Sequence, residues 1–180
     1  MLRVEVQRSQ KSYDFKADQK KPDGFENNWK NNSLDWLVVL DDRAELCRFR
    51  CQSVANYCFG DMRPGDIVPY GDTIAPGEFT LQAFVDRRQF HGEIHAITRT
   101  RDLDGQWITR NAMQTTAGGF QNGRWLVHDR FSFKTNCDTR YAWSAGCIIL
   151  SSADLASFAK ILHAYKVQPG NLIPGEVNEM

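Results

Sequence analysis

Residues 36–52, WLVVLDDRAELCRFRCQ, carry the clearest secondary-structure signal in the sequence. An apolar run from Trp36 to Leu40 leads into the turn residues Asp41 and Asp42, and apolar and polar residues then alternate over 44–52. Alternation with a period of two puts every second side chain on the same face of a strand, and aspartates favour tight turns. The stretch predicts a β-hairpin, so a β-rich fold is the first expectation.

Most other patterned segments also have strand character. Alternation of Leu2, Val4 and Val6 with polar residues predicts a short N-terminal strand, followed by a polar loop. Runs of apolar or β-branched residues bounded by turn residues predict further strands at 79–84, 93–98, 106–109, 124–128 and 147–150.

Helical spacing is nearly confined to residues 151–165. Leu155, Phe158 and Leu162 recur at helical intervals, a serine at 151 or 152 can cap the first turn, and a Pro-Gly pair at 169–170 ends the pattern. The predicted fold is mostly β, a β-sandwich or barrel-like sheet, with one C-terminal amphipathic helix packed on it.

Composition restricts the class of protein. A chain of 180 residues with 42% hydrophobic residues can form one sizeable core. We therefore expect a single domain, with 1–33 contributing a strand and a polar loop to it and 34–180 forming the main part. Lys plus Arg and Asp plus Glu number 22 each, so no overall field attracts nucleic acid. No long apolar run or signal-peptide core is visible, so no membrane insertion is expected.

The five cysteines do not form a metal or redox motif. No pair has the Cys-x-x-Cys spacing. On a strand, Cys47 and Cys51 would be roughly 13 Å apart, too far for a disulfide. We expect Cys47, Cys51 and Cys58 to be reduced thiols in apolar surroundings. A disulfide between Cys137 and Cys147 is a less favoured alternative to free thiols.

Cys147 follows Ser144, Ala145 and Gly146 in the stretch YAWSAGCIIL (141–150). A cysteine nucleophile requires a base, and His128, at the end of an apolar strand, is the candidate. Gly146 allows the backbone to approach a carbonyl closely, so the N–H groups of Gly146 and Cys147 could stabilise an oxyanion. The alternative is that Cys147 is a core residue and His128 a buried imidazole.

These residues resemble the L,D-transpeptidase (YkuD-type) catalytic domain of bacterial cell-wall enzymes. The signature of that family is a histidine, an intervening segment and Ser/Thr-His-Gly-Cys, and the segment HDRFSFKTNCDTRYAWSAGCII is similar to it. The hairpin at 36–50, the APGEF turn at 75–79 and the helix after the cysteine also resemble the family. The resemblance extends in outline over residues 36–165.

The resemblance implies acyl transfer on peptidoglycan stem peptides without a metal or organic cofactor. Cys147 would attack the amide carbonyl, the terminal D-residue would leave, and the thioester would pass to an amine or to water. His128 would act as base and then as acid, Ser144 would orient the ring or the turn, and Gly146 would contribute to the oxyanion hole. The catalytic residues implied are therefore Cys147, His128, Ser144 and Gly146. The neighbours Arg140, Trp143 and Ala145 are the implied substrate-binding residues.

The sequence departs from the family pattern at three positions. The histidine before Gly-Cys is Ala145, the Arg or Asn two residues after the cysteine is Ile149, and the glycine usual after the first histidine is Asp129. Arg140 or Arg130 is a possible substitute for the missing arginine. Residues 85–123 fit the family poorly and are expected to form an insertion or a lid.

Two other function classes stay open. One is a catalytically inactive, cell-wall-binding module, and the other is an antibacterial effector or phage-type enzyme that modifies peptidoglycan. In each case the expected place of action is the bacterial cell envelope. The HGEIH motif at 91–95 could suggest a metal site, but a polar surface face is favoured. His163 is expected to be structural and is the alternative base if His128 lies far from Cys147.

Overall fold

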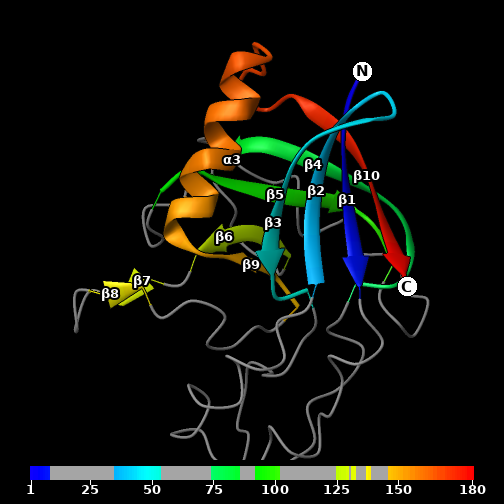
Figure 1. The fold of residues 1–180 in the computed structure, drawn as a ribbon, viewed down its shortest axis with the longest axis horizontal. Helices are drawn as coiled ribbons and strands as arrows, with labels where there is room; N and C mark the ends of the chain where they lie inside the picture. The colour runs from blue at the N-terminus through cyan, green and yellow to red at the C-terminus, as the bar shows by residue number, and fades with distance from the viewer. Residues whose placement is uncertain are drawn as a thin grey trace, which may run out of the picture.

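A curled sheet of eight strands forms the framework of the protein (Figure 1). The structure is a computed structural model that describes residues 1–8, 35–53, 74–85, 92–101, 125–129 and 146–180, and the backbone of 131–132 and 137–138. The strand order is β3-β2-β1-β10-β4-β5-β6-β9. The strands are β1 (Leu2–Arg8), β2 (Asp35–Asp41), β3 (Ala44–Cys51), β4 (Gly77–Val85), β5 (Ile94–Arg99), β6 (Leu126–Asp129), β9 (Ile148–Leu150) and β10 (Leu172–Glu179). Two short strands, β7 (Phe131–Ser132) and β8 (Cys137–Asp138), pair separately.

The two edges of the large sheet meet just beyond β3. Gln52 donates its backbone N–H to the carbonyl of Ile149 at 2.9 Å, and Ile149 donates to the carbonyl of Gln52 at 2.8 Å. This antiparallel bridge joins the end of β3 to β9, so the sheet is nearly closed and barrel-like. Closure satisfies backbone groups that an open sheet edge would expose.

The predicted hairpin is confirmed as β2 and β3. The two strands pair antiparallel, with a register shift at Val39/Leu40. Asp42, in the turn, has a φ of 51°, a left-handed conformation that aspartate tolerates better than most residues. The mostly β fold with one helix is thus correct for the described part of the chain, and the strands predicted around Val4, Leu81, Ile97 and Val127 are present.

Strand β10 was not predicted from the sequence. It lies in the middle of the sheet, parallel to β1 and antiparallel to β4. Pro174 pairs with Thr80 of β4, whereas pairing with β1 begins only at the next residue, Gly175. Proline cannot donate a ladder hydrogen bond. Pro174 lies one residue before the pairing with β1 starts, so this pairing does not need its missing N–H.

Helix α3 (Ser152–Ala164) packs against the inside of the curled sheet. The side chain of Ser151 caps it by accepting a hydrogen bond from the N–H of Asp154 at 3.1 Å. Its buried residues include Phe158, whose ring meets those of Phe49 and His95 edge-on, at centroid distances of 6.2 and 4.9 Å. The buried side of the helix therefore packs between β3 and β5.

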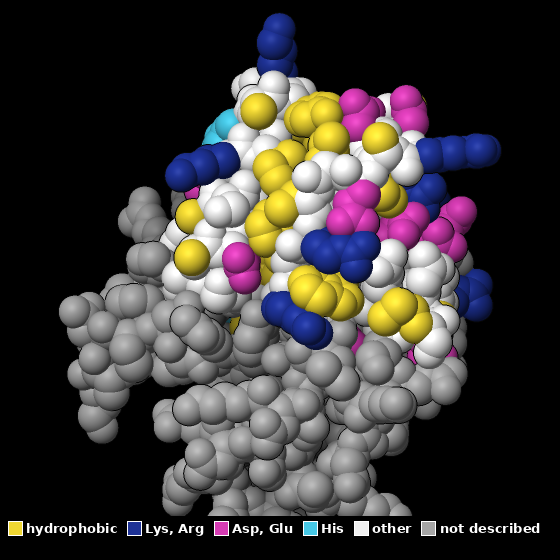
Figure 2. All heavy atoms as spheres, in the orientation of Figure 1, with side chains coloured by type: hydrophobic (Ala, Val, Ile, Leu, Met, Phe, Trp, Pro, Cys, Tyr) yellow, Lys and Arg dark blue, Asp and Glu magenta, His cyan; other side chains and the backbone are white. Residues whose placement is uncertain are grey.

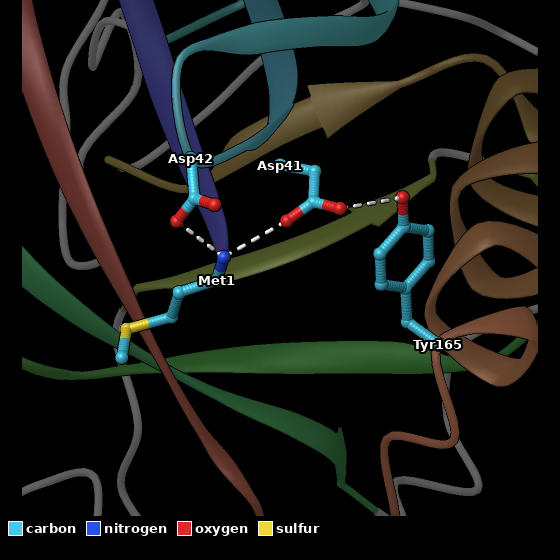
Figure 3. Close-up of polar contacts among 4 residues, drawn as sticks. All are labelled: Met1, Asp41, Asp42 and Tyr165. Carbon is cyan, nitrogen blue, oxygen red and sulfur yellow. Dashed lines mark hydrogen bonds and ion pairs between the residues drawn. The ribbon is translucent and has the colours of Figure 1, made fainter.

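The C-terminal end of α3 is tied to the β2–β3 turn. Tyr165 donates its hydroxyl to Asp41 Oδ2 at 3.2 Å, and the Met1 ammonium contacts Asp41 at 2.8 Å and also Asp42 (Figure 3).

Around the same hairpin, basic, acidic and apolar side chains lie intermixed on the face shown in Figure 2. The arginines Arg48 and Arg50 lie over the indole of Trp36, at 5.4 and 3.9 Å from the ring centroid.

The range 85–123 is partly a strand of the sheet. Residues 94–99, which were expected to belong to an insertion or lid, form β5 between β4 and β6. The strand predicted at 106–109 lies outside the described residues. In the part of the chain that the structure describes, no helix is long and apolar enough to cross a membrane.

Candidate active site

His128 and the strand that follows Cys147 lie side by side in the sheet. Strands β6 and β9 are parallel, with His128 opposite Ile149. Cys147 immediately precedes β9 and is two positions before Ile149. With neighbouring strands about 4.8 Å apart and a rise of about 3.3 Å per residue, the Cα atoms of His128 and Cys147 are about 8 Å apart. The register thus brings the two candidate residues into one neighbourhood.

The same register predicts that both side chains lie on one face of the sheet. Directly opposed residues on neighbouring strands share a face, and residues two apart along an extended chain do so as well. His128 and Ile149 therefore share one face, and we expect Cys147, which lies directly before β9, to face the same side. His95, opposite Val127 on the other face, contacts Phe158 of α3. The face of His128 and Cys147 is consequently the one turned away from α3.

A backbone hydrogen bond sets the tautomer of His128. Its Nδ1 is 2.5 Å from the carbonyl oxygen of Asp129. A carbonyl can only accept, so Nδ1 carries the proton, and in the neutral ring Nε2 is the basic nitrogen. The ring is 3% exposed and is held in one orientation. A fixed ring with a basic Nε2 is suited to accept a proton from a nearby thiol.

Cys147 is more buried than a nucleophile in an open cleft would be. Its side chain is 8% exposed and belongs to the apolar core cluster that includes Ile148 and Leu150. Gly146, just before it, has a φ of 116°, a conformation that glycine adopts readily and other residues do not. The backbone therefore bends at Gly146, immediately ahead of the cysteine.

A buried carboxylate lies beside the candidate base. Asp129 is 1% exposed, and its Oδ2 accepts a hydrogen bond of 2.6 Å from the hydroxyl of Ser152. Ser152 is the first residue of α3, so this contact joins the end of β6 to the start of the helix. The sequence singled out Asp129 only as a departure from a family pattern and did not predict its contact with Ser152.

Gln52 is a second residue that the sequence did not indicate. It pairs with Ile149 through the bridge that closes the sheet, and its side chain, 4% exposed, shares the face of His128 and Cys147. Only the closure of the sheet brings it there. An amide on this face can donate or accept a hydrogen bond next to the candidate nucleophile.

The other predicted site residues lie outside the described residues. These are Ser144, the proposed orienting residue, and the three proposed substrate-binding residues Arg140, Trp143 and Ala145. Arg130 also lies outside them. The described part of the candidate site consists of His128, Gly146 and Cys147 with their neighbours.

The polar surface expected for the HGEIH segment is present at Glu93 but not at His95. His95 is fully buried, and its Nδ1 accepts the backbone N–H of Phe84 at 3.1 Å. Glu93 is exposed and contacts His163 Nε2 at 2.9 Å. The expectation of a polar surface face was therefore wrong for His95, because the strand turns this residue toward α3. His163 is bound to Glu93, on the side of the sheet opposite to that of Cys147.

No cluster of three or more potential metal ligands occurs among the residues that the structure describes. The described cysteines Cys47, Cys51 and Cys147 form no disulfide with one another. Burial raises the pKa of the Cys51 thiol well above its ordinary value, and the nearby Asp35 raises it further. The carboxylate of Asp35 and the apolar interior thus keep Cys51 protonated and unreactive.

A groove of about 680 Å³ lies elsewhere, on the outer side of β1, β4 and β10. Its lining includes Arg3, Glu78, Thr80, Pro174 and Glu176, and neither His128 nor Cys147 contributes to it. Arg3 binds Glu176 there at 3.0 Å. The described lining of the groove contains no cysteine or histidine, so thiol chemistry is better sought at β6 and β9.

Comparison with known proteins identifies a relative but no activity. No family model and no solved structure matches the chain. A protein of Treponema pallidum (strain Nichols), described as an uncharacterized protein, is 48% identical over 180 residues, which cover 99% of this chain and 81% of the relative. Identity at this level over nearly the whole chain shows common descent. The chain therefore belongs to the same protein family as this Treponema pallidum protein.

Proposed function

We propose that the protein is a cysteine-dependent acyltransferase of the L,D-transpeptidase (YkuD) type that acts on peptidoglycan stem peptides. The observation that carries the proposal is the parallel pairing of β6 with β9, in which His128 is opposite Ile149, two residues after Cys147. A base and a thiol on one face of neighbouring strands are the minimum required for thiolate chemistry.

Two further features support this chemistry. The Nδ1–H of His128 donates to the Asp129 carbonyl, so the basic Nε2 can take the thiol proton. Gly146, with its φ of 116°, turns the backbone immediately before Cys147, where main-chain N–H groups would stabilise an oxyanion.

In the proposed reaction, the Cys147 thiolate attacks the carbonyl carbon of a stem-peptide amide. The C–N bond breaks, and the leaving amine takes the proton that His128 removed from the thiol. The thioester then passes either to the amine of another stem, which forms a crosslink, or to water, which releases a shortened peptide. The mostly β, barrel-like sheet with one helix is compatible with a YkuD-type fold, which is part of the proposal.

The test is covalent labelling of Cys147. Wild-type protein incubated with a carbapenem should gain the mass of one whole carbapenem, because opening of the β-lactam ring releases no leaving group, and peptide mapping should locate it on Cys147. The Cys147→Ala variant should gain none, whereas Cys47→Ala, which removes a half-buried thiol of β3, should be labelled like wild type. Purified muropeptides incubated with the same proteins should yield shortened or crosslinked products only where Cys147 is present.

One observation favours a second function, a binding module without chemistry. Cys147 is only 8% exposed and belongs to the apolar core. A thiol that stays buried to this degree cannot reach a substrate. Absence of labelling in the wild type, or equal labelling of wild type and Cys147→Ala, would support binding without chemistry. Sedimentation of both proteins with purified peptidoglycan would then measure the binding.

A further inference from the structure

The hydrogen bond between Asp129 and Ser152 is suited to fix the position of the Asp129 side chain. A buried carboxylate is costly unless hydrogen bonds compensate for the loss of water, and Asp129 is 1% exposed. The Ser152 hydroxyl donates to it at 2.6 Å, a short hydrogen bond. Ser152 lies in the first turn of α3, where the helix dipole also favours a negative charge. Two effects, the hydrogen bond from Ser152 and the helix dipole, thus hold the Asp129 side chain at the start of the helix.

Asp129 also holds the ring of His128, through its backbone. The Asp129 carbonyl accepts the Nδ1–H of His128, while the Asp129 carboxylate is bound on the other side of the strand by Ser152. Because Ser152 fixes the carboxylate of Asp129, rotation of the Asp129 peptide group about its backbone bonds is restricted. The orientation of the carbonyl, and with it the tautomer of His128, is therefore linked to the helix start.

We infer that Asp129 and Ser152 are positioning residues that keep His128 in the Nδ1–H tautomer, with Nε2 as the base for Cys147. This inference rests on the proposed function for its role in catalysis, but the tautomer itself does not depend on activity. The sequence resemblance does not imply this pair, because the family usually has glycine, which has no carboxylate, at the position of Asp129. It makes the start of α3 part of the candidate site.

The tautomer can be measured directly by ¹⁵N NMR of the full chain labelled in its histidine rings. The His128 signals are assigned by their loss in His128→Gln. Wild type should show a protonated Nδ1 and an unprotonated Nε2 at pH 8. Folded Ser152→Ala should show a mixture of the two tautomers, Ser152→Thr should restore the wild-type pattern, and Ser157→Ala, on the exposed side of α3, should leave it unchanged.

If Ser152→Ala fails to fold, Asp129→Ala provides a second route to the same loss. An Nε2–H tautomer in the wild type, or a wild-type tautomer in a folded Ser152→Ala or Asp129→Ala protein, would overturn the inference. If wild type is acylated by a carbapenem, we expect the acylation rate constant of Ser152→Ala to fall about tenfold and that of Ser152→Thr to recover. Absence of acylation in wild type would overturn the proposed function, while the NMR result would still decide the role of Ser152.

Discussion

The ring of Phe79 packs directly against the backbone of Gly175, its cross-strand partner between β4 and β10. A Cβ built on Gly175 would lie 2.3 Å from Cε2 and Cζ of the ring. Such an approach is far inside van der Waals contact. Gly175 is therefore required for the packing of this ring, and not for an unusual φ.

Gly175→Ala should destabilise the protein by about 1–3 kcal/mol, because the ring must move within a packed interior. The free energy of unfolding from urea titration measures the change. In a Phe79→Leu background the smaller side chain leaves room for the methyl group, so the cost of Gly175→Ala should be smaller. Equal costs in the two backgrounds would show that the clash is not the cause.

A second prediction concerns the buried guanidinium of Arg8. Arg8 is 1% exposed and donates to the Ser53 hydroxyl at 3.0 Å and to the Ile74 carbonyl at 2.8 Å. Ser53 donates in turn to Asp35 Oδ2 at 2.5 Å. Burial lowers the pKa of Arg8, and the nearby Asp35 acts in the opposite direction. The network therefore balances one buried cation against one buried anion.

Arg8→Met should lower the free energy of unfolding by about 3–5 kcal/mol, since it leaves the Asp35 charge in the interior without its counterion. The double variant Arg8→Met/Asp35→Asn should be more stable than Arg8→Met alone. Arg3→Met is the control, because Arg3 is partly exposed in its ion pairs with Glu5 and Glu176, and such pairs contribute about 0–1 kcal/mol. Similar losses for Arg8→Met and Arg3→Met would contradict the prediction.

The elements that could be predicted from the sequence are those with an uninterrupted pattern. The hairpin around Asp42 and the helix around Phe158 follow from periodicity and turn chemistry. Strand β10 has the same alternation, with Ile173 and Val177 buried, but Pro174 and Gly175 interrupt it and are residues that normally break strands. Local propensity is overridden there by pairing with strands from distant parts of the chain.

The candidate site could be predicted only in part for a related reason. The His128 and Cys147 pair follows from residue types and spacing, whereas their common face depends on the register of β6 and β9, which sequence does not give. Gln52 lies next to the candidate site because the sheet closes between Gln52 and Ile149. Ser152 contacts Asp129 because α3 starts directly after β9. Each of these contacts depends on topology, so no local pattern indicates it.

The N-cap of α3 gives a prediction about helix stability. Ser151 accepts the N–H of Asp154, which otherwise has no partner within the first turn. Ser151→Ala should cost about 1 kcal/mol, and Ser151→Asp, which keeps an accepting oxygen, should cost less. Thermal unfolding followed by far-ultraviolet circular dichroism measures both. The control is Ser157→Ala, since Ser157 is exposed and bonds only within the helix, and a loss there equal to that of Ser151→Ala would argue against capping.

The last prediction concerns the pH dependence of stability that arises from His95. Burial, and to a lesser degree the charge of His163, lowers the pKa of His95 from 6.5 to about 3. Between these values the unfolded chain binds a proton that the folded protein does not bind. The free energy of unfolding should therefore fall as the pH decreases from about 6.5, by about 2 kcal/mol at pH 5, and should not depend on this group well above pH 7.

Replacing His95 by asparagine should remove this part of the pH dependence. Asparagine can still accept the N–H of Phe84 but has no group that titrates in this range. Urea titrations of wild type and His95→Asn between pH 5 and 7 should give a shallower slope for the variant. His163→Gln, which alters an exposed histidine bound to Glu93, is the control and should keep most of the wild-type slope. If instead the wild-type and His95→Asn slopes coincide, His95 accepts a proton in the folded protein, and its burial against Phe158 cannot be as tight as the structure shows.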